Sequence, residues 1–179
     1  MNKQTEIRLS GSGGQGIITA GIILAEAALL DGLNALQSQS YGPEARGGSS
    51  KAEVIISEKE IDYPKVTQPN ILVALTQEAY DIYKSGLMDD SVVILDAGIV
   101  VETDAAYRVY QVPVTEIART QLRPVVANII TLGALVTLTK CVSYASLQEA
   151  VLDRVPKGTE ELNKKALAAG VLAVEQLIG

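Results

Sequence analysis

The chain has 179 residues, of which 47% are hydrophobic and 20% charged, a balance typical of a globular protein with a sizeable core and not of a disordered one. Its net charge of −6 argues against nucleic-acid binding, because such proteins usually present a basic face to the phosphate backbone. With one cysteine and no histidine, the chain cannot by itself hold an iron–sulfur cluster, close an internal disulfide or build a common type of zinc site.

The N-terminal stretch MNKQTEIRLSG lacks the apolar core of a signal peptide. Elsewhere, Gly, Glu, Thr or Lys interrupts each apolar stretch before it reaches the roughly 20 residues that a membrane span needs. We therefore expect a cytoplasmic protein without a membrane segment.

The first half of the chain reads as strands around one long helix. A strand at residues 6–10 leads through GSGGQG into a helix that is apolar on nearly all sides and that ends at Gly32, a favourable C-terminal cap. Two further strand-like segments, residues 33–39 and 51–57, flank a loop rich in turn-forming residues.

The second half begins with two continuous apolar runs, residues 71–75 and 91–98, which are typical of strands covered on both faces. The helix between them is expected to begin at Thr76 as N-cap and to stop at Gly86. Another strand follows at residues 107–114, and four helices are then expected at residues 115–122, 125–142, 146–155 and 159–179. Ser146 with Glu149 three residues later predicts a capping box at the start of the third of these helices.

Strands that alternate with helices predict an α/β fold, with an open, mostly parallel sheet flanked by helices and a Rossmann-like glycine-rich first turn. Residues 40–54 are expected to add either a hairpin or an irregular excursion. Because the sequence shows no internal repeat, linker or low-complexity segment, we expect residues 1–179 to form a single domain.

The stretch GSGGQG satisfies the pattern G-x-G-x-x-G with Gly11, Gly13 and Gly16. Glycines between a strand and a helix let the backbone approach a pyrophosphate, which the helix N-terminus then binds. A dinucleotide site also needs an acid after the second strand, but that strand ends in LQSQS without a carboxylate. NAD is therefore disfavoured. The loop is expected either to bind an isolated phosphate or carboxylate, or to form a tight turn packed under a neighbour.

A second dense stretch, SYGPEARGGSS at residues 40–50, places Arg46 between two pairs of turn-forming residues. Such an arginine suits a bidentate contact to a phosphate or carboxylate, although a surface ion pair with Glu44 is an equally good explanation. In an open sheet the loops after the first two strands lie at the same edge, where ligands bind. We therefore expect the two loops to share a site.

Two other residues have reactive side chains. Asp96 ends a buried strand at the same expected edge, where a carboxylate more often caps a turn than catalyses a reaction. Cys141 lies in the apolar run LVTLTKCV and is expected to be a small buried hydrophobic residue. The chain shows no complete catalytic constellation.

Four stretches, taken in chain order, resemble the gamma subunit of the 2-oxoacid:ferredoxin oxidoreductases: GSGGQGIITAGIILAEAA, QSYGPEARGGSSKAEVIIS, PNILVAL and NIITLGAL. The similarity runs over essentially the whole chain, and G-x-G-G-Q-G combined with Y-G-x-x-x-R-G-G is far more specific than either motif alone. The length also resembles a free-standing gamma subunit. One departure is Asn70, where relatives often have aspartate, so no ionised role is expected at this position.

The resemblance implies a subunit of an enzyme that converts a 2-oxoacid, coenzyme A and oxidised ferredoxin into acyl-CoA, carbon dioxide and reduced ferredoxin. Its favoured substrate is 2-oxoglutarate, with pyruvate or branched 2-oxoacids as alternatives. Thiamine diphosphate with Mg would be held between alpha and beta subunits, and iron–sulfur clusters would lie in beta, delta or fused domains. This chain would bind no redox centre, would pack beside the thiamine subunits near the coenzyme A approach, and could form a homodimer when isolated.

The resemblance also places two groups of residues at the active assembly, in a binding and not a catalytic role: Gly11, Ser12, Gly13, Gly14, Gln15 and Gly16, and Tyr41, Gly42, Arg46, Gly47 and Gly48. Gln15 is expected to offer its amide to a ligand or a facing subunit. Arg46 is expected to contact an anion such as a coenzyme A phosphate. No catalytic residue and no metal ligand is assigned to this chain.

Two other functions stay open. A stand-alone nucleotide-binding or regulatory module would bind its nucleotide alone, whereas the oxidoreductase subunit would co-purify with thiamine- and cluster-bearing chains. The small subunit of an indolepyruvate oxidoreductase would keep the enzyme class and change the substrate. Wide apolar faces on residues 17–32, 125–136 and 166–179 favour burial in an assembly, although an ordinary core would account for them equally well.

Overall fold

A sheet forms the centre of the structure, a computed structural model that describes residues 4–41, 48–100, 102–103 and 106–179. Within these ranges it contains six strands in the order β2-β3-β1-β4-β5-β6: β1 (Thr5–Ser12), β2 (Asn34–Tyr41), β3 (Ser49–Ser57), β4 (Ile71–Ala74), β5 (Val92–Asp96) and β6 (Arg108–Val112). The pairs β1–β4, β4–β5 and β5–β6 are parallel, whereas β3 lies between β1 and β2 and is antiparallel to both. The mostly parallel sheet is therefore confirmed, and β2 and β3 form the hairpin that was one of two expectations.

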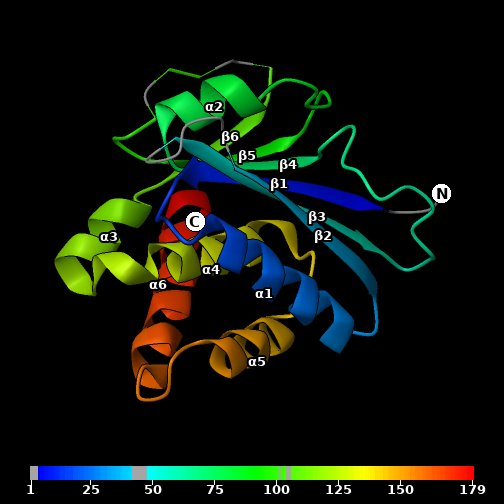
Figure 1. Cartoon of the computed structure of the whole chain (residues 1–179). Coiled ribbons are helices and arrows are strands. Elements are labelled where there is room, and N and C mark those ends of the chain that lie inside the picture. The colour runs from blue at the N-terminus through cyan, green and yellow to red at the C-terminus, as the bar shows by residue number, and fades with distance from the viewer. Residues whose placement is uncertain (1–3, 42–47, 101, 104–105) are drawn as a thin grey trace.

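Helices cover the sheet unequally. Figure 1 shows α2 on one face and the other helices on the opposite face. Their bounds are α1 (Ile17–Leu30), α2 (Gln77–Tyr83), α3 (Val114–Gln121), α4 (Ala127–Thr139), α5 (Tyr144–Arg154) and α6 (Glu160–Ile178), with a short 3-10 turn η1 (Pro124–Val126) before α4. Across the described ranges, every helix is too short or too polar to span a bilayer.

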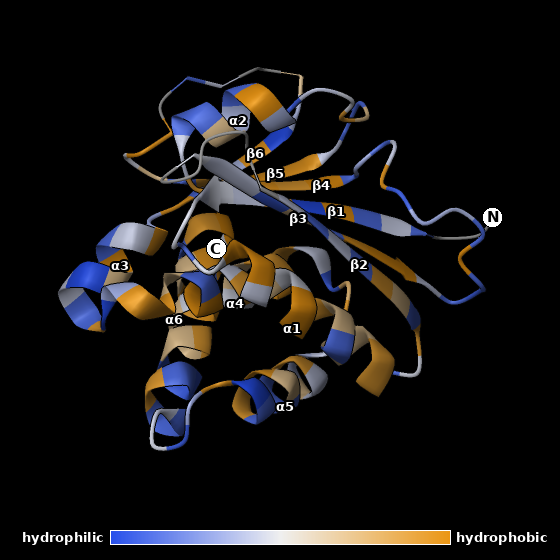
Figure 2. Ribbon diagram, viewed as in Figure 1, coloured by the Kyte–Doolittle hydropathy of each residue, from blue (hydrophilic) through white to orange (hydrophobic). Residues whose placement is uncertain are grey.

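The main core lies between the sheet and the larger helix layer, and a smaller cluster around Tyr80 lies under α2. In Figure 2 the hydrophobic colour gathers on α1, α4 and the strands, while α3 and α5 carry polar residues as well. Thr76 caps α2 as predicted, because its side chain accepts a hydrogen bond from the Ala79 N–H at 3.1 Å. The α/β architecture thus follows the pattern of apolar runs in the sequence.

The backbones of helices α4 and α6 are in close contact where the two helices cross. A Cβ atom at Gly133 would lie 2.3 Å from the Leu167 carbonyl oxygen, and one at Gly170 would lie 2.1 Å from that of Ile130. Only glycine fits at such a crossing, because a methyl group on either helix would force the two apart. Since α4 is buried from Asn128 to Val136, its apolar character is explained by packing within the chain.

Helix α1 ends as the sequence predicts. Gly32 has a φ of 77°, its N–H donates to the Leu29 carbonyl at 3.0 Å, and the Leu33 N–H donates to that of Ala28 at 3.0 Å. This pair of bonds is the Schellman motif, which favours glycine because of the left-handed backbone. Leu33 then packs against the core and leads into β2.

The prediction for the start of α5 was wrong. The N-cap is Ser143, whose Oγ accepts from the Ser146 N–H at 3.1 Å, so the helix begins earlier than the Ser146–Glu149 pattern indicated. The reason is a contact that the local sequence does not reveal. Asp31, at the end of α1, accepts hydrogen bonds from the Ser143 N–H, the Ser143 Oγ and the Ser146 Oγ, each at 2.6 Å.

Candidate functional site

The glycine loop leaves the sheet at the carboxyl ends of the parallel strands. Gly11 and Ser12 still belong to β1, where they pair with Ser50 and Ser49 of β3. The Gly13 N–H then donates to the Gly48 carbonyl at 3.1 Å. The structure therefore brings the first loop against the residue that precedes β3, as expected for two loops at one edge of the sheet.

Gln15 links the two ends of the glycine loop by hydrogen bonds to Ser12. Its Oε1 accepts from the Ser12 N–H at 2.7 Å, and its own N–H donates to the Ser12 carbonyl at 3.3 Å. A Cβ at Gly11 would lie 2.4 Å from this Oε1, so the glycine makes room for the side chain. The Gln15 oxygen is thus engaged within the loop, and the Nε2 group is the donor that Gln15 can offer to a ligand or a subunit.

Gly16 marks the start of α1 and meets another helix. It has a φ of 73°, which favours glycine. The Nδ2 of Asn128 in α4 donates to the Gly16 carbonyl at 3.3 Å. Sequence reasoning quoted Asn128 only as part of NIITLGAL and missed this contact. The available signal was a lone amide at the start of a long apolar run.

The part of the loop open to solvent is small. Gly13 and Gly14 are exposed, Ser12 is half-buried, and a Cβ at Gly14 would meet nothing within 4 Å. No side chain caps the first turn of α1, whose N-terminal end carries a partial positive charge. Exposed backbone beside such an end is suited to an anion that approaches closely.

The second predicted group is described only in part. Gly42, Arg46 and Gly47 lie outside the described residues, so the expectation for Arg46 stays a prediction. Tyr41 is the last residue of β2, where its backbone pairs with Ser50, and Gly48 makes the bond to Gly13.

Asp96 supports the fold at this edge. It is fully buried, and its carboxylate accepts hydrogen bonds from the Thr115 N–H, at 3.2 Å, and from the Thr115 Oγ1. Burial raises the pKa of Asp96, and the hydrogen bonds from Thr115 oppose that rise. The carboxylate therefore binds the first turn of α3, 19 residues along the chain, whereas the sequence predicted a cap on a turn near Asp96 itself.

Sequence reasoning also missed a charged network on the α2 face. The Arg8 Nε lies 2.8 Å from Oε1 of Glu53, its partner across β1 and β3, and its Nη1 donates to the carbonyls of Tyr83 at 2.9 Å and Ser85 at 3.0 Å. Arg8 therefore ties the end of α2 to the sheet. The signal was a pair of opposite charges in two segments that were both predicted as strands.

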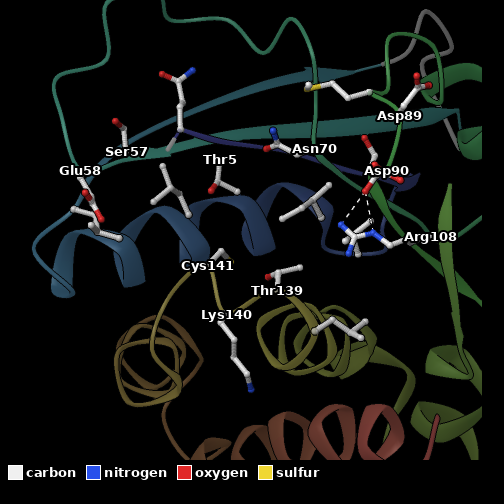
Figure 3. A pocket seen from close by; sticks show the side chains of 18 residues that line it. Thr5, Ser57, Glu58, Asn70, Asp89, Asp90, Arg108, Thr139, Lys140 and Cys141 are labelled. Carbon is white, nitrogen blue, oxygen red and sulfur yellow. Dashed lines mark hydrogen bonds between the residues drawn. The ribbon is translucent and has the colours of Figure 1, made fainter. Parts of the chain in front are cut away.

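A cavity of about 600 Å³ lies at the opposite edge of the sheet, near the start of β1 and the end of α4 (Figure 3). Arg108 lines it and donates from Nε and Nη2 to the Asp90 carbonyl, at 3.0 and 2.9 Å. Cys141 also lines it, and burial raises the pKa of this thiol. None of the predicted site residues that the structure describes lines this cavity.

Asn70, another residue of the cavity wall, holds the backbone of β1. Its Oδ1 accepts from the Glu6 N–H at 2.6 Å. An uncharged amide is sufficient for this bond. Over the described ranges, no group of three or more His, Cys, Asp or Glu side chains is placed to hold a metal ion.

Comparison with known proteins supports the resemblance. Residues 6–173 match the family model described as pyruvate ferredoxin/flavodoxin oxidoreductase. The chain is 53% identical over 178 residues to "2-oxoglutarate synthase subunit KorC" of Methanocaldococcus jannaschii. The alignment covers 96% of this chain and 95% of that protein. It is 32% identical over 165 residues to "Pyruvate synthase subunit PorC" of the same organism, in an alignment that covers 90% of this chain and 92% of that protein.

Solved structures agree. The gamma subunit of a keto/oxoacid ferredoxin oxidoreductase from Geobacter sulfurreducens superposes with a TM-score of 0.90 at 45% identity, covering 97% of this chain and 98% of that one. A 2-oxoglutarate:ferredoxin oxidoreductase from Magnetococcus marinus, with 2-oxoglutarate, coenzyme A and succinyl-CoA bound, shares the fold with a TM-score of 0.89 at 24% identity. That match covers 98% of this chain and 32% of the other. The chain therefore belongs to the pyruvate ferredoxin/flavodoxin oxidoreductase family, as a gamma-type subunit of the 2-oxoacid:ferredoxin oxidoreductases.

Proposed function

We propose that this chain is the gamma subunit of a 2-oxoglutarate:ferredoxin oxidoreductase, which converts 2-oxoglutarate, coenzyme A and oxidised ferredoxin into succinyl-CoA, carbon dioxide and reduced ferredoxin. One observation carries the choice of substrate. Within a single organism, identity is 53% to the 2-oxoglutarate synthase subunit and 32% to the pyruvate synthase subunit, each over nearly the full length.

The side chains of this chain show which part of the enzyme's chemistry it leaves to other subunits. One cysteine and no histidine cannot supply the roughly four ligands of an iron–sulfur cluster. As the resemblance to the family implies, alpha, beta and, in some assemblies, delta subunits would hold the thiamine diphosphate, its Mg and the clusters, and would pass electrons to ferredoxin. The chain itself, with residues 1–179 as one domain, would serve assembly and the approach of coenzyme A. The cytoplasmic location expected from the sequence stays a prediction.

The carboxyl edge of the sheet is the part of this chain best suited to coenzyme A. Gly13 and Gly14 are exposed beside the positive end of α1, and coenzyme A carries phosphates. The bond from Gly13 to Gly48 places the end of the Arg46 loop next to them. We therefore assign the binding role to the residues predicted from the sequence: Gly11, Ser12, Gly13, Gly14, Gln15, Gly16, Tyr41, Gly42, Arg46, Gly47 and Gly48.

The first experiment identifies the assembly and its substrate. The tagged chain is purified under anaerobic conditions, its partners and cofactors are identified, and activity is measured with 2-oxoglutarate, pyruvate, branched 2-oxoacids and indolepyruvate. We expect thiamine- and cluster-bearing subunits and the highest kcat/KM with 2-oxoglutarate. A preference for pyruvate or indolepyruvate would contradict the substrate, and a cofactor-free single chain that binds a nucleotide would favour the stand-alone module.

A second experiment tests the contact with coenzyme A. Arg46→Ala in the reconstituted complex should raise the KM for coenzyme A about tenfold, because a charge-assisted hydrogen bond is lost. Arg154→Ala is the matched control, since Arg154 pairs with Glu26 between α1 and α5. An unchanged KM for coenzyme A in an intact Arg46→Ala complex would remove Arg46 from the proposed site.

A further inference from the structure

Asn128 is a buried amide at the start of an apolar helix. It is 8% exposed, and the next eight residues of α4 are also buried, all of them apolar except Thr131. Burying an amide costs about 1–3 kcal/mol unless its polar atoms find partners. The partners of Asn128 therefore indicate its role.

The amide joins the first turns of two helices. Its Oδ1 accepts from the Ile129 N–H at 3.0 Å, one of the N–H groups that α4 leaves without an intrahelical acceptor. Its Nδ2 donates to the Gly16 carbonyl at 3.3 Å, which also accepts the first hydrogen bond of α1, from the Ala20 N–H. A single side chain thus links positions 112 residues apart.

The contact with Gly16 is close as well as polar. A Cβ at Gly16 would lie 2.5 Å from the Asn128 Nδ2 and 2.9 Å from its Cγ. The amide therefore occupies the space that a side chain at position 16 would need. Displacement of Asn128 would free the backbone of Gly16, where the loop turns into α1.

The glycine loop is thus held at three points. Gln15 bonds Ser12 within the loop, the Gly13 N–H bonds the Gly48 carbonyl, and Asn128 holds the last residue of the loop. We propose that Asn128 is a positioning residue for coenzyme A, which acts by holding the glycine loop in the shape that receives the ligand. This inference rests on the function proposed above.

The test separates the position of the loop from the stability of the fold. Asn128→Ser keeps a short polar group at the start of α4 and cannot reach Gly16. The matched control is Thr131→Val in the same helix, because the buried Thr131 hydroxyl donates to the Ala127 carbonyl of its own helix, at 2.8 Å. Hydrogen exchange of the amides of residues 12–16 is measured on the full chain, and the KM and kcat are measured on the reconstituted complex.

We expect Asn128→Ser to speed exchange of the loop amides about tenfold and to raise the KM for coenzyme A about tenfold, with kcat within twofold of wild type. Thr131→Val should change neither quantity. Unchanged exchange in the loop would overturn the positioning role. Faster exchange with an unchanged KM would show that Asn128 holds the loop, but would overturn its role for coenzyme A and count against the proposed contact of the loop with coenzyme A.

A second variant covers the case in which Asn128→Ser does not fold. Asn128→Asp keeps an acceptor for the Ile129 N–H, favourable at a helix N-terminus, and removes the donor to the Gly16 carbonyl. Faster loop exchange in a chain that melts as wild type would support the proposal. Wild-type exchange in that variant would overturn it.

Discussion

The two ends of α1 are completed in different ways. At its C-terminal end, Gly32 closes the backbone bonds, and Asp31 accepts three hydrogen bonds from Ser143 and Ser146. At its N-terminal end, no side chain caps the first turn, and Gly13 and Gly14 are exposed. We call the C-terminal end the sealed end because its last backbone groups and Asp31 are hydrogen-bonded, although Leu29, Leu30 and Gly32 are exposed there. We call the N-terminal end, which has no side-chain cap, the open end.

This difference indicates which end is available for binding. At the sealed end the carbonyls of Ala27, Ala28 and Leu29 accept backbone hydrogen bonds, so changes there should alter stability alone. At the open end, hydrogen bonds from Gln15 and Asn128 fix the shape of the loop, while Gly13 and Gly14 stay exposed. Changes there should therefore affect the use of coenzyme A as well as the fold, and four predictions test that contrast.

The largest effect is expected from Gly16→Ala. Its φ of 73° strains any side chain, and the added Cβ would overlap the Asn128 amide. Together these should lower the free energy of unfolding by about 2.5 kcal/mol and also raise the KM for coenzyme A. Urea unfolding and steady-state kinetics measure the two effects. A loss of stability without any change in KM would mean that the open end has no binding role.

Asp31→Ala should lower the free energy of unfolding by about 1.5 kcal/mol, because three hydrogen bonds to a carboxylate are lost at a partly exposed site where solvent screens them. The KM for coenzyme A should stay at its wild-type value in the assembled complex. A raised KM with intact assembly would break the contrast between the two ends.

Gly14→Ala should cost only about 1 kcal/mol of stability, since its φ is 85° but a Cβ meets nothing within 4 Å. The KM for coenzyme A should nevertheless rise, because the methyl group stands where a ligand would approach. Thermal unfolding and kinetics on the same preparation decide this prediction. A wild-type KM would show that the ligand does not approach Gly14.

The smallest effect is a pH dependence at the sealed end. Burial alone would raise the pKa of Asp31, but hydrogen bonds from Ser143 and Ser146 outweigh it and lower that pKa. The carboxylate therefore contributes stability that is fully present above its unfolded pKa, near 3.8, and lost as the pH falls through its folded pKa.

The matching measurement is urea unfolding of wild type and Asp31→Asn at pH 7 and at pH 3. The difference in the free energy of unfolding between the two proteins should be smaller at pH 3. An equal difference at both pH values would show that the pKa of Asp31 does not differ between the folded and unfolded chain.

Local patterns were sufficient to predict most of the fold. The apolar runs of β4 and β5, the Thr76 cap and the Gly32 cap depend on residues near in sequence, and the structure confirms them. The glycine loop was recognisable for the same reason. Its exposed part, by contrast, could be separated from its buried part only in three dimensions.

The errors and omissions come from contacts distant in sequence. The start of α5 depends on Asp31, which lies 112 residues before Ser143. The Asn128 contact spans the same separation, and Arg8 reaches the end of α2 across 75 residues. Periodicity and caps carry no information about such pairs, because they describe only what each segment does by itself.

The most direct test of the account is hydrogen exchange on the intact complex with and without coenzyme A. We predict that coenzyme A slows exchange at residues 12–16, at the open end of α1, and leaves residues 29–33 at the sealed end unchanged. Exchange at residues 12–16 that stays the same when coenzyme A saturates the complex would contradict the claim that this end faces the ligand.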